Sequence, residues 1–185
     1  MSQRIEDYAL IGDCETAALV GRNGSIDWLC WPAFDSDACF AAILGTDKNG
    51  RWLIAPSEAA TRISRRYLGN TLILETRFET KSGTVALIDF MPPRGKASDI
   101  VRLVRGVSGT VKMRMELVIR FGFGADIPWV RRMDHALLAI CGQDMTVLRT
   151  PVATHGEDLT TIAEFEIGAD ETVPCLLYTS PSPRD

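Results

Sequence analysis

Residues 111–121 read VKMRMELVIRF, and this stretch decides the fold class because its apolar side chains recur at every second position. One face carries only apolar side chains: Val111, Met113, Met115, Leu117, Ile119 and Phe121. The other face carries Lys112, Arg114, Glu116 and Arg120, with Val118 as the exception. A period of two is that of a β-strand, whose side chains point alternately to the two sides of a sheet. The stretch therefore predicts a long strand with one buried face.

The same period appears on both sides of this strand. Residues 72–79 and 159–167 also alternate apolar with polar side chains. Their apolar positions are Leu72, Leu74 and Phe78 in the first, and Leu159, Ala163, Phe165 and Ile167 in the second. Turn-forming tripeptides separate such runs: Arg22-Asn23-Gly24, Lys48-Asn49-Gly50, Lys81-Ser82-Gly83 and Gly142-Gln143-Asp144. About a dozen strands follow from these patterns. We expect an all-β fold, a large antiparallel β-sandwich, with at most a short helix near residues 39–45.

Composition limits the classes of partner and site. The chain has 185 residues and a net charge of −4, which favours no nucleic-acid partner. No apolar run reaches the roughly 18 residues of a membrane helix, so we expect no membrane partner and a cytoplasmic location. Five cysteines and two histidines lack the spacing of a zinc site. No metal or cofactor is expected.

Residues 24–40, GSIDWLCWPAFDSDACF, combine aromatic, acidic and thiol side chains in one short stretch. Gly24 to Trp31 reads as a strand, with Trp28 facing the core beside Ile26. Pro32 cannot donate a hydrogen bond to a sheet, so the strand should end there. Residues 33–37 then form a loop that displays Phe34 and Asp35. Such a ring can cover the apolar face of a sugar while carboxylates accept its hydroxyl hydrogen bonds. The alternative, which composition favours, is that Phe34 and Phe40 anchor the loop and Asp35 caps a turn or helix.

Carboxylates are numerous at this end of the chain. They are Glu6, Asp7, Asp13, Glu15, Asp27, Asp35 and Asp37. A glycosidase needs two carboxyl groups placed across the scissile bond. Spacing along the chain does not show that any two of these face each other, and acids near turns usually serve as caps or solvated charges. No catalytic residue is assigned among them.

The C-terminus departs from the strand pattern. Residues 171–174 look like the start of one more strand, but residues 175–185, CLLYTSPSPRD, turn to Ser and Pro. LLYTSPSPRD is similar to a translated sequencing-adapter tail. We expect one domain over residues 1–174, and a non-native or disordered tail over 175–185 that arose as an assembly artefact. The nucleotide sequence downstream of Pro174 tests this expectation.

Several ordered motifs together resemble one known family. They are Ile5-Glu6-Asp7-Tyr8, Ile11-Gly12-Asp13, Thr16-Ala17-Ala18-Leu19-Val20, Gly24-Ser25-Ile26-Asp27-Trp28, Pro32-x-Phe34-Asp35-Ser36, Gly50-x-Trp52, Tyr67, Asn70-Thr71-Leu72, Thr84-Val85 and Asp89-Phe90-Met91-Pro92. This set is similar to the N-terminal domain of bacterial glycoside hydrolase family 15 proteins, which are glucoamylase-like and trehalase-like.

The resemblance implies a β-sandwich that precedes an (α/α)₆ barrel with two catalytic glutamates of an inverting mechanism. That barrel is absent from this chain, so the fragment alone is expected to be inactive. The barrel, and an α-glucan or trehalose at the domain interface, are the implied partners. Trp31, Pro32, Phe34 and Asp35 are the candidate substrate-rim residues. Ala33 departs from the family pattern, which has a basic residue there.

Two other hypotheses stay open. The chain could be a freestanding carbohydrate-binding module with Trp31 and Phe34 as its stacking platform. It could also be purely an interaction domain whose apolar patch normally meets the missing barrel. The choice between trehalose and maltose-type substrates does not follow from this sequence.

Overall fold

The computed structural model describes residues 3–95, 97–134 and 136–179. These residues form fifteen strands and four short 3₁₀ helices, and no α-helix, which confirms the all-β prediction. The strands are β1 (Tyr8–Gly12), β2 (Ala17–Gly21), β3 (Ser25–Cys30), β4 (Ala38–Phe40), β5 (Arg51–Pro56), β6 (Arg62–Tyr67), β7 (Leu74–Glu79), β8 (Gly83–Phe90), β9 (Asp99–Val118), β10 (Trp129–Met133), β11 (Ala136–Cys141), β12 (Asp144–Arg149), β13 (His155–Glu157), β14 (Thr160–Gly168) and β15 (Thr172–Thr179). The 3₁₀ helices are η1 (Ile5–Asp7), η2 (Ala42–Leu44), η3 (Asp47–Asn49) and η4 (Gly122–Gly124). Within these residues, no helix has the length and apolar character needed to cross a membrane.

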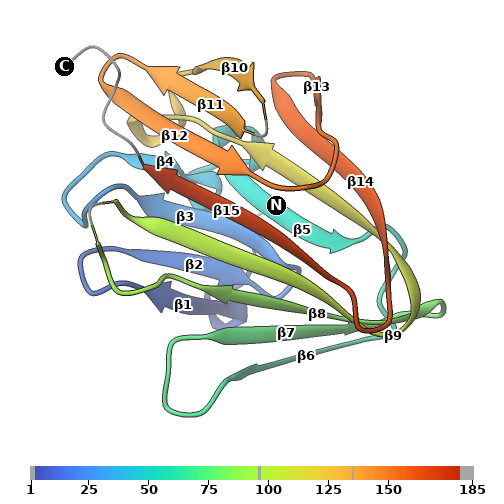
Figure 1. Cartoon of the computed structure of the whole chain (residues 1–185). Helices are drawn as coiled ribbons and strands as arrows, with labels where there is room; N and C mark the ends of the chain where they lie inside the picture. The colour runs from blue at the N-terminus through green and yellow to red at the C-terminus, as the bar shows by residue number, and fades with distance from the viewer. Residues whose placement is uncertain (1–2, 96, 135, 180–185) are drawn as a thin grey trace.

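The long strand β9 joins the two halves of the antiparallel sheet. Its first half pairs with β8 and β15, and its second half pairs with β5 and β14 (Figure 1). The strand bends between Gly106 and Gly109, where Val107 is left without a partner on β8. Gly109 has φ +66°, and a Cβ there would lie 2.2 Å from the Ser82 carbonyl oxygen, so only glycine fits. This bulge turns one sheet into two facing layers.

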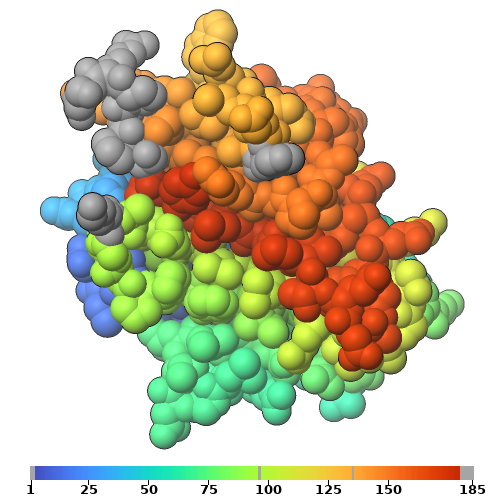
Figure 2. All heavy atoms as spheres, viewed as in Figure 1, coloured from blue at the N-terminus to red at the C-terminus, as the bar shows by residue number. Residues whose placement is uncertain are grey.

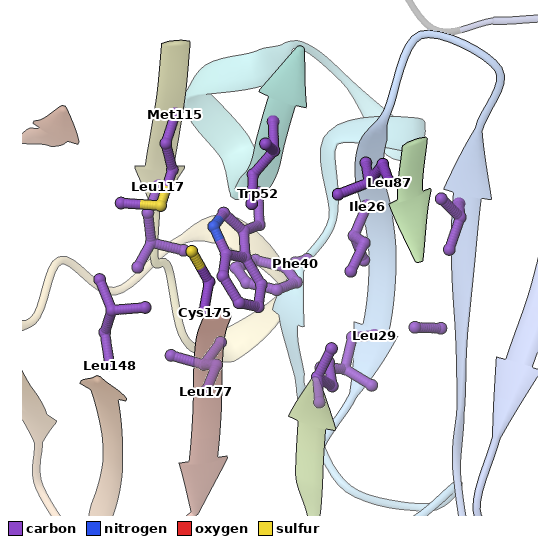
Figure 3. Close-up of a cluster of buried hydrophobic side chains, with 14 of the residues drawn as sticks. Ile26, Leu29, Phe40, Trp52, Leu87, Met115, Leu117, Leu148, Cys175 and Leu177 are labelled. Carbon is purple, nitrogen blue, oxygen red and sulfur yellow. The ribbon is translucent and has the colours of Figure 1, made fainter. Parts of the chain in front are cut away.

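The hydrophobic core lies between these layers. Ile26, Trp52 and Met115 come from one half of the sheet, and Leu87 and Leu177 from the other. Figure 3 shows Trp52 near the middle of this cluster. Trp52 is fully buried, and it is the largest of the described side chains that are less than 2% exposed. The core therefore holds together strands that are far apart in the sequence.

The last described strand, β15, occupies a central place in the sheet. It pairs with β9 on one side and with β12 on the other, so it connects β10, β11 and β12 to the rest of the sheet. Cys175 and Leu177 of β15 are fully buried. Cys175 to Thr179 of the expected tail thus belong to β15, and residues 180–185 lie outside the described residues. Whether the tail is native stays a prediction.

The simple alternation of the sequence fails at several strand ends. It holds in β9 through Leu117, but Val118, Ile119, Arg120 and Phe121 are all buried, because the chain leaves the sheet there and packs on several sides. Two leucines expected in the core are exposed: Leu72 by 46% and Leu159 by 67%. Both lie just outside a strand, so the alternation no longer orients them.

The expected helix near residues 39–45 is a strand followed by a single turn. Ala38–Phe40 forms β4, which pairs with β3, and Ala42–Leu44 forms η2. Cys39 and Phe40 pack in the main core, and Ala38 and Ala41 pack in a second small cluster, so this segment buries side chains on both of its sides. A helix with one apolar face would bury only one side.

Candidate functional site

Strand β3 leads into the loop that the sequence singled out, and a bulge changes which side chains face the core. Leu19 pairs with Trp28 and Val20 pairs with Ile26, so Asp27 is the extra residue. Because of this bulge, Ile26 and Leu29 both enter the main core, while Trp28 points to the other side. Trp28 is half-buried, with its ring 6.3 Å from that of Phe123. The prediction that Trp28 anchors the main core is therefore wrong.

The loop between β3 and β4 is closed by its own backbone. The N–H of Trp31 donates to the Asp37 carbonyl oxygen at 3.3 Å. The N–H of Ser36 donates to the Ala33 carbonyl oxygen at 3.1 Å. The N–H of Ala33 donates to Ser36 Oγ at 3.1 Å, so Ser36 takes the capping role suggested for Asp35. The Trp31–Pro32 peptide bond is cis. The three hydrogen bonds define one conformation for the loop.

The four candidate rim residues separate into an anchor and a displayed group. Trp31 is only 5% exposed and packs in the main core, so its ring face is not open to a ligand. Phe34 is 63% exposed, and Pro32 and Asp35 are also exposed. A stacking platform made of Trp31 and Phe34 together does not fit this arrangement. The displayed surface consists of Pro32, Phe34 and Asp35.

An ionic network around the buried Asp13 holds this loop against the β1–β2 connection. Arg94 Nε lies 3.0 Å from Asp13 Oδ2, and Arg94 Nη1 lies 3.0 Å from a Glu15 carboxylate oxygen. Arg94 also donates to the carbonyl oxygen of Pro32. The N–H of Phe34 donates to the Glu15 carbonyl oxygen at 3.0 Å. The loop is therefore held at both Pro32 and Phe34, which lowers the entropic cost of presenting Phe34 to a partner.

Asp13 is the centre of that network, and its side chain is fully buried. Its carboxylate accepts hydrogen bonds from the N–H groups of Glu15 and Thr16, from Arg94 and from the Ser98 hydroxyl. Burial alone would raise the pKa of Asp13, but these four donors favour the charged form and hold the pKa below its usual value. Asp13 is thus a structural carboxylate that stays ionised at neutral pH.

Substituting Asp13 by Asn is expected to make folding less sensitive to acid. A carboxyl group with a lowered pKa in the folded state stabilises the protein above its unfolded-state pKa, and that stabilisation is lost as pH falls through the folded-state value. The wild-type chain should lose stability as pH falls through the usual range of an Asp carboxyl and below it. The Asp13→Asn variant should lose less free energy of unfolding over that range than the wild-type chain does. Urea unfolding at a series of pH values measures this difference.

Asp144→Asn is the matched control, because the shift at Asp144 has the opposite sign. Burial first, and then the charges of Asp37 and Asp126, raise the pKa of Asp144. That carboxyl contributes stability at low pH which is lost as pH rises through its folded-state pKa. Replacing Asp144 by Asn should therefore make the free energy of unfolding fall more steeply as pH decreases. An Asp13→Asn profile with the wild-type slope would contradict the role given to Asp13.

A hollow of about 350 Å³ opens beside the loop. Its lining includes Trp31, Pro32, Arg94, Asp144 and Thr146. Guanidinium, carboxylate and hydroxyl groups therefore border the displayed surface, as they would in a site for a hydroxyl-rich ligand. The sequence reasoning did not single out Arg94 or Asp144. Arg94 lies two positions after the Asp89–Pro92 motif, and its closeness to that motif was the available signal.

Asp27 is also structural. It is 6% exposed and accepts hydrogen bonds from the Ser25 hydroxyl and, at 2.7 Å, from the Tyr8 hydroxyl. Burial, and then the hydrogen bond to Asp27 and its charge, raise the pKa of Tyr8. Of the acids at this end of the chain, Asp13 and Asp27 are buried and bonded. Asp35 is the acid of the displayed surface, and Asp37, at the end of the same loop, is also exposed.

A family model and the curated relatives point to the same family. A family model described as "Trehalase-like, N-terminal" matches residues 1–173. The trehalase of Thermoplasma volcanium is 34% identical over 142 residues, which cover 73% of this chain and 23% of that protein. The trehalase of Mycolicibacterium smegmatis is 34% identical over 138 residues, which cover 64% of this chain and 20% of that protein. The chain thus spans about a fifth of the length of these curated relatives.

A solved structure titled "Putative kojibiose phosphorylase from human microbiome" aligns with 94% of this chain and 29% of its own, with a TM-score of 0.43 and 8% sequence identity.

Proposed function

Because this chain belongs to the trehalase-like N-terminal domain family, we propose that it is the non-catalytic sandwich domain of an enzyme that hydrolyses α-glucosidic bonds. The relatives have about four-fifths of their length outside the matched region. In our proposal that part is an (α/α)₆ barrel of the glycoside hydrolase family 15 type, which supplies both catalytic glutamates. Trehalose is the proposed substrate, since the relatives are named trehalases.

Within that enzyme, the β3–β4 loop forms part of the rim of the sugar pocket. The observation that carries this role is the 63% exposed ring of Phe34 on a loop held by Arg94 and the buried Asp13. A large apolar side chain on a preorganised loop is suited to contact a partner or a glucosyl ring. Asp35 beside it can accept hydrogen bonds from sugar hydroxyls.

The first test measures hydrolysis. The purified chain alone is expected to release no glucose from trehalose or maltose. The chain is then co-expressed with the part of the Thermoplasma volcanium trehalase that follows its matched region, so that neither part has to fold alone. Trehalose hydrolysis by the co-purified complex supports the proposal. Sugar release by the chain alone, lost on substituting Asp35, would contradict it.

The second test concerns Phe34. In the active complex, Phe34→Ala is expected to raise KM for trehalose by about 5- to 30-fold, the effect of losing about 1–2 kcal/mol of ring contact. The thermal midpoint of the chain should not change, because the ring is mostly exposed. Leu72→Ala, at an exposed leucine between β6 and β7, is the control and should leave KM unchanged. Equal KM values for Phe34→Ala and wild type would rule out a rim role.

A further inference from the structure

The edge strand β10 is fully exposed, as is the shorter strand β13. All five of its residues are exposed, and it pairs only with β11, so its other edge has no partner among the described strands. It lies at the upper rim of the molecule in Figures 1 and 2. Trp129 is 87% exposed and Val130 is 54% exposed. An exposed apolar edge strand of this kind marks an interaction surface.

A hollow of about 340 Å³ lies between the start of β10, the end of β9 and the turn from β13 to β14. Ile127, Val130 and Leu159 line it and are each more than half exposed. Asp158 and Leu159 form a tight turn in which both have positive φ, 47° and 60°. This conformation is unfavourable for leucine, yet it projects an apolar side chain into solvent at the edge of the hollow. These side chains give the hollow an apolar rim, and Glu157 and Asp158 also line it.

Arg120 lies in the wall of the same hollow and lacks a counter-ion. It is 7% exposed, and no carboxylate oxygen of the described residues lies within 4.0 Å of its guanidinium group. It donates to the Ile119 carbonyl oxygen at 2.7 Å and to that of Leu159 at 3.4–3.5 Å. Burial lowers its pKa. A buried arginine is costly unless it is paired, so this group points to a missing carboxylate.

We call Arg120, Ile127, Trp129, Val130 and Leu159 the β10 surface. We propose that the β10 surface docks the catalytic part of the parent enzyme, which places a carboxylate against Arg120 and apolar side chains in the hollow. This inference rests on the proposed function. Two facts favour this occupant: the relatives carry about four-fifths of their length outside the matched region, and the unpaired cation calls for an acidic partner.

The experiment uses the complex described above, with two surface variants and two matched controls. Arg120→Met removes the cation, and Leu159→Asp adds a charge to the apolar rim of the hollow. The controls are Arg62→Met and Leu72→Asp, at an exposed arginine and an exposed leucine outside this surface. Sedimentation velocity over a dilution series measures the affinity. Both surface variants should weaken the complex about tenfold or more, and both controls should leave it unchanged.

Thermal unfolding of the isolated chain separates docking from plain structural support. Without its partner, Arg120 is an uncompensated buried charge, so Arg120→Met should unfold at the same temperature as wild type or higher. A lower thermal midpoint for Arg120→Met would show that Arg120 stabilises this domain by itself, and it would overturn the inference.

The remaining outcomes distinguish the inference from the proposed function. Equal affinity for wild type and both surface variants would place the interface elsewhere and leave the proposed function standing. No complex with the wild-type chain would count against both. A dimer of the isolated chain that Arg120→Met and Leu159→Asp convert to monomer would show that a second copy occupies the β10 surface, and would overturn our choice of partner.

Discussion

A chain that ends at Val173 is expected not to fold cooperatively. The truncation removes most of β15, which lies between β9 and β12 and connects them by hydrogen bonds. It also removes Cys175 and Leu177, which are fully buried. Burying one leucine side chain contributes about 1.5–3 kcal/mol, and a whole domain is stable by only about 5–15 kcal/mol. Loss of a central strand exceeds what the fold can tolerate, because β10, β11 and β12 lose their attachment to the sheet.

The matched control is a chain that ends at Thr179, where β15 ends. It should unfold at the wild-type temperature in a single transition by circular dichroism and by tryptophan fluorescence. The shorter chain should show a broad or absent transition and bind a hydrophobic dye. Equal thermal midpoints for the two chains would contradict the role of β15. The result holds whether or not the tail is native, because β15 requires apolar side chains at positions 175 and 177 in either case.

Substituting Asp89 by Asn is expected to destabilise the fold by about 3–5 kcal/mol, because it leaves Arg102 as an unpaired buried charge. Both side chains are fully buried, and Arg102 Nε lies 2.8 Å from Asp89 Oδ1. Arg102 also donates to the carbonyl oxygens of Trp52 and Gly24, at 2.5 and 2.7 Å. This one side chain therefore connects β8 and β9 to β5 and to the turn before β3. Urea unfolding at neutral pH measures the loss.

The pairing itself is tested by a double variant. Asp89→Leu combined with Arg102→Met removes both charges, so it should cost less than the sum of the two single changes. Some loss should remain, because the carbonyl oxygens of Trp52 and Gly24 lose a donor. Glu79→Gln is the control, since Glu79 pairs with Arg62 at 3.8 Å on the surface and such pairs are worth less than about 1 kcal/mol. Strict additivity would contradict the ion-pair account.

Local patterns predicted most strands, because alternation and turn residues act over short distances. The turns at Arg22-Asn23-Gly24, Lys81-Ser82-Gly83 and Gly142-Gln143-Asp144 each join two paired strands, as expected. The first half of β9 was not predicted, because the charged Arg102 occupies a buried position there while Val101 and Leu103 are only partly buried. The orientation of Trp28 was missed because the bulge at Asp27 depends on the register between β2 and β3.

The candidate site was predictable only in part. The sequence singled out Pro32, Phe34 and Asp35, and these residues are exposed on one loop. It also placed Trp31 on that surface, but Trp31 is in the core because the bulge in β3 shifts the alternation that follows. Arg94 was not foreseen as the residue that holds the loop, since it is 81 residues away from Asp13 along the chain.

The sequence by itself determined the class of fold and the family, since both depend on the order and period of residues along the chain. The tertiary structure decided which polar groups are buried and which groups they pair with. Asp13 accepts hydrogen bonds from four donors, and Asp89 pairs with Arg102. Arg120 has no carboxylate partner within the described residues and donates to carbonyl oxygens instead. The cost of a buried charge depends on its neighbours in space. Those neighbours are set by how β9 bends the sheet, which no short stretch of sequence encodes.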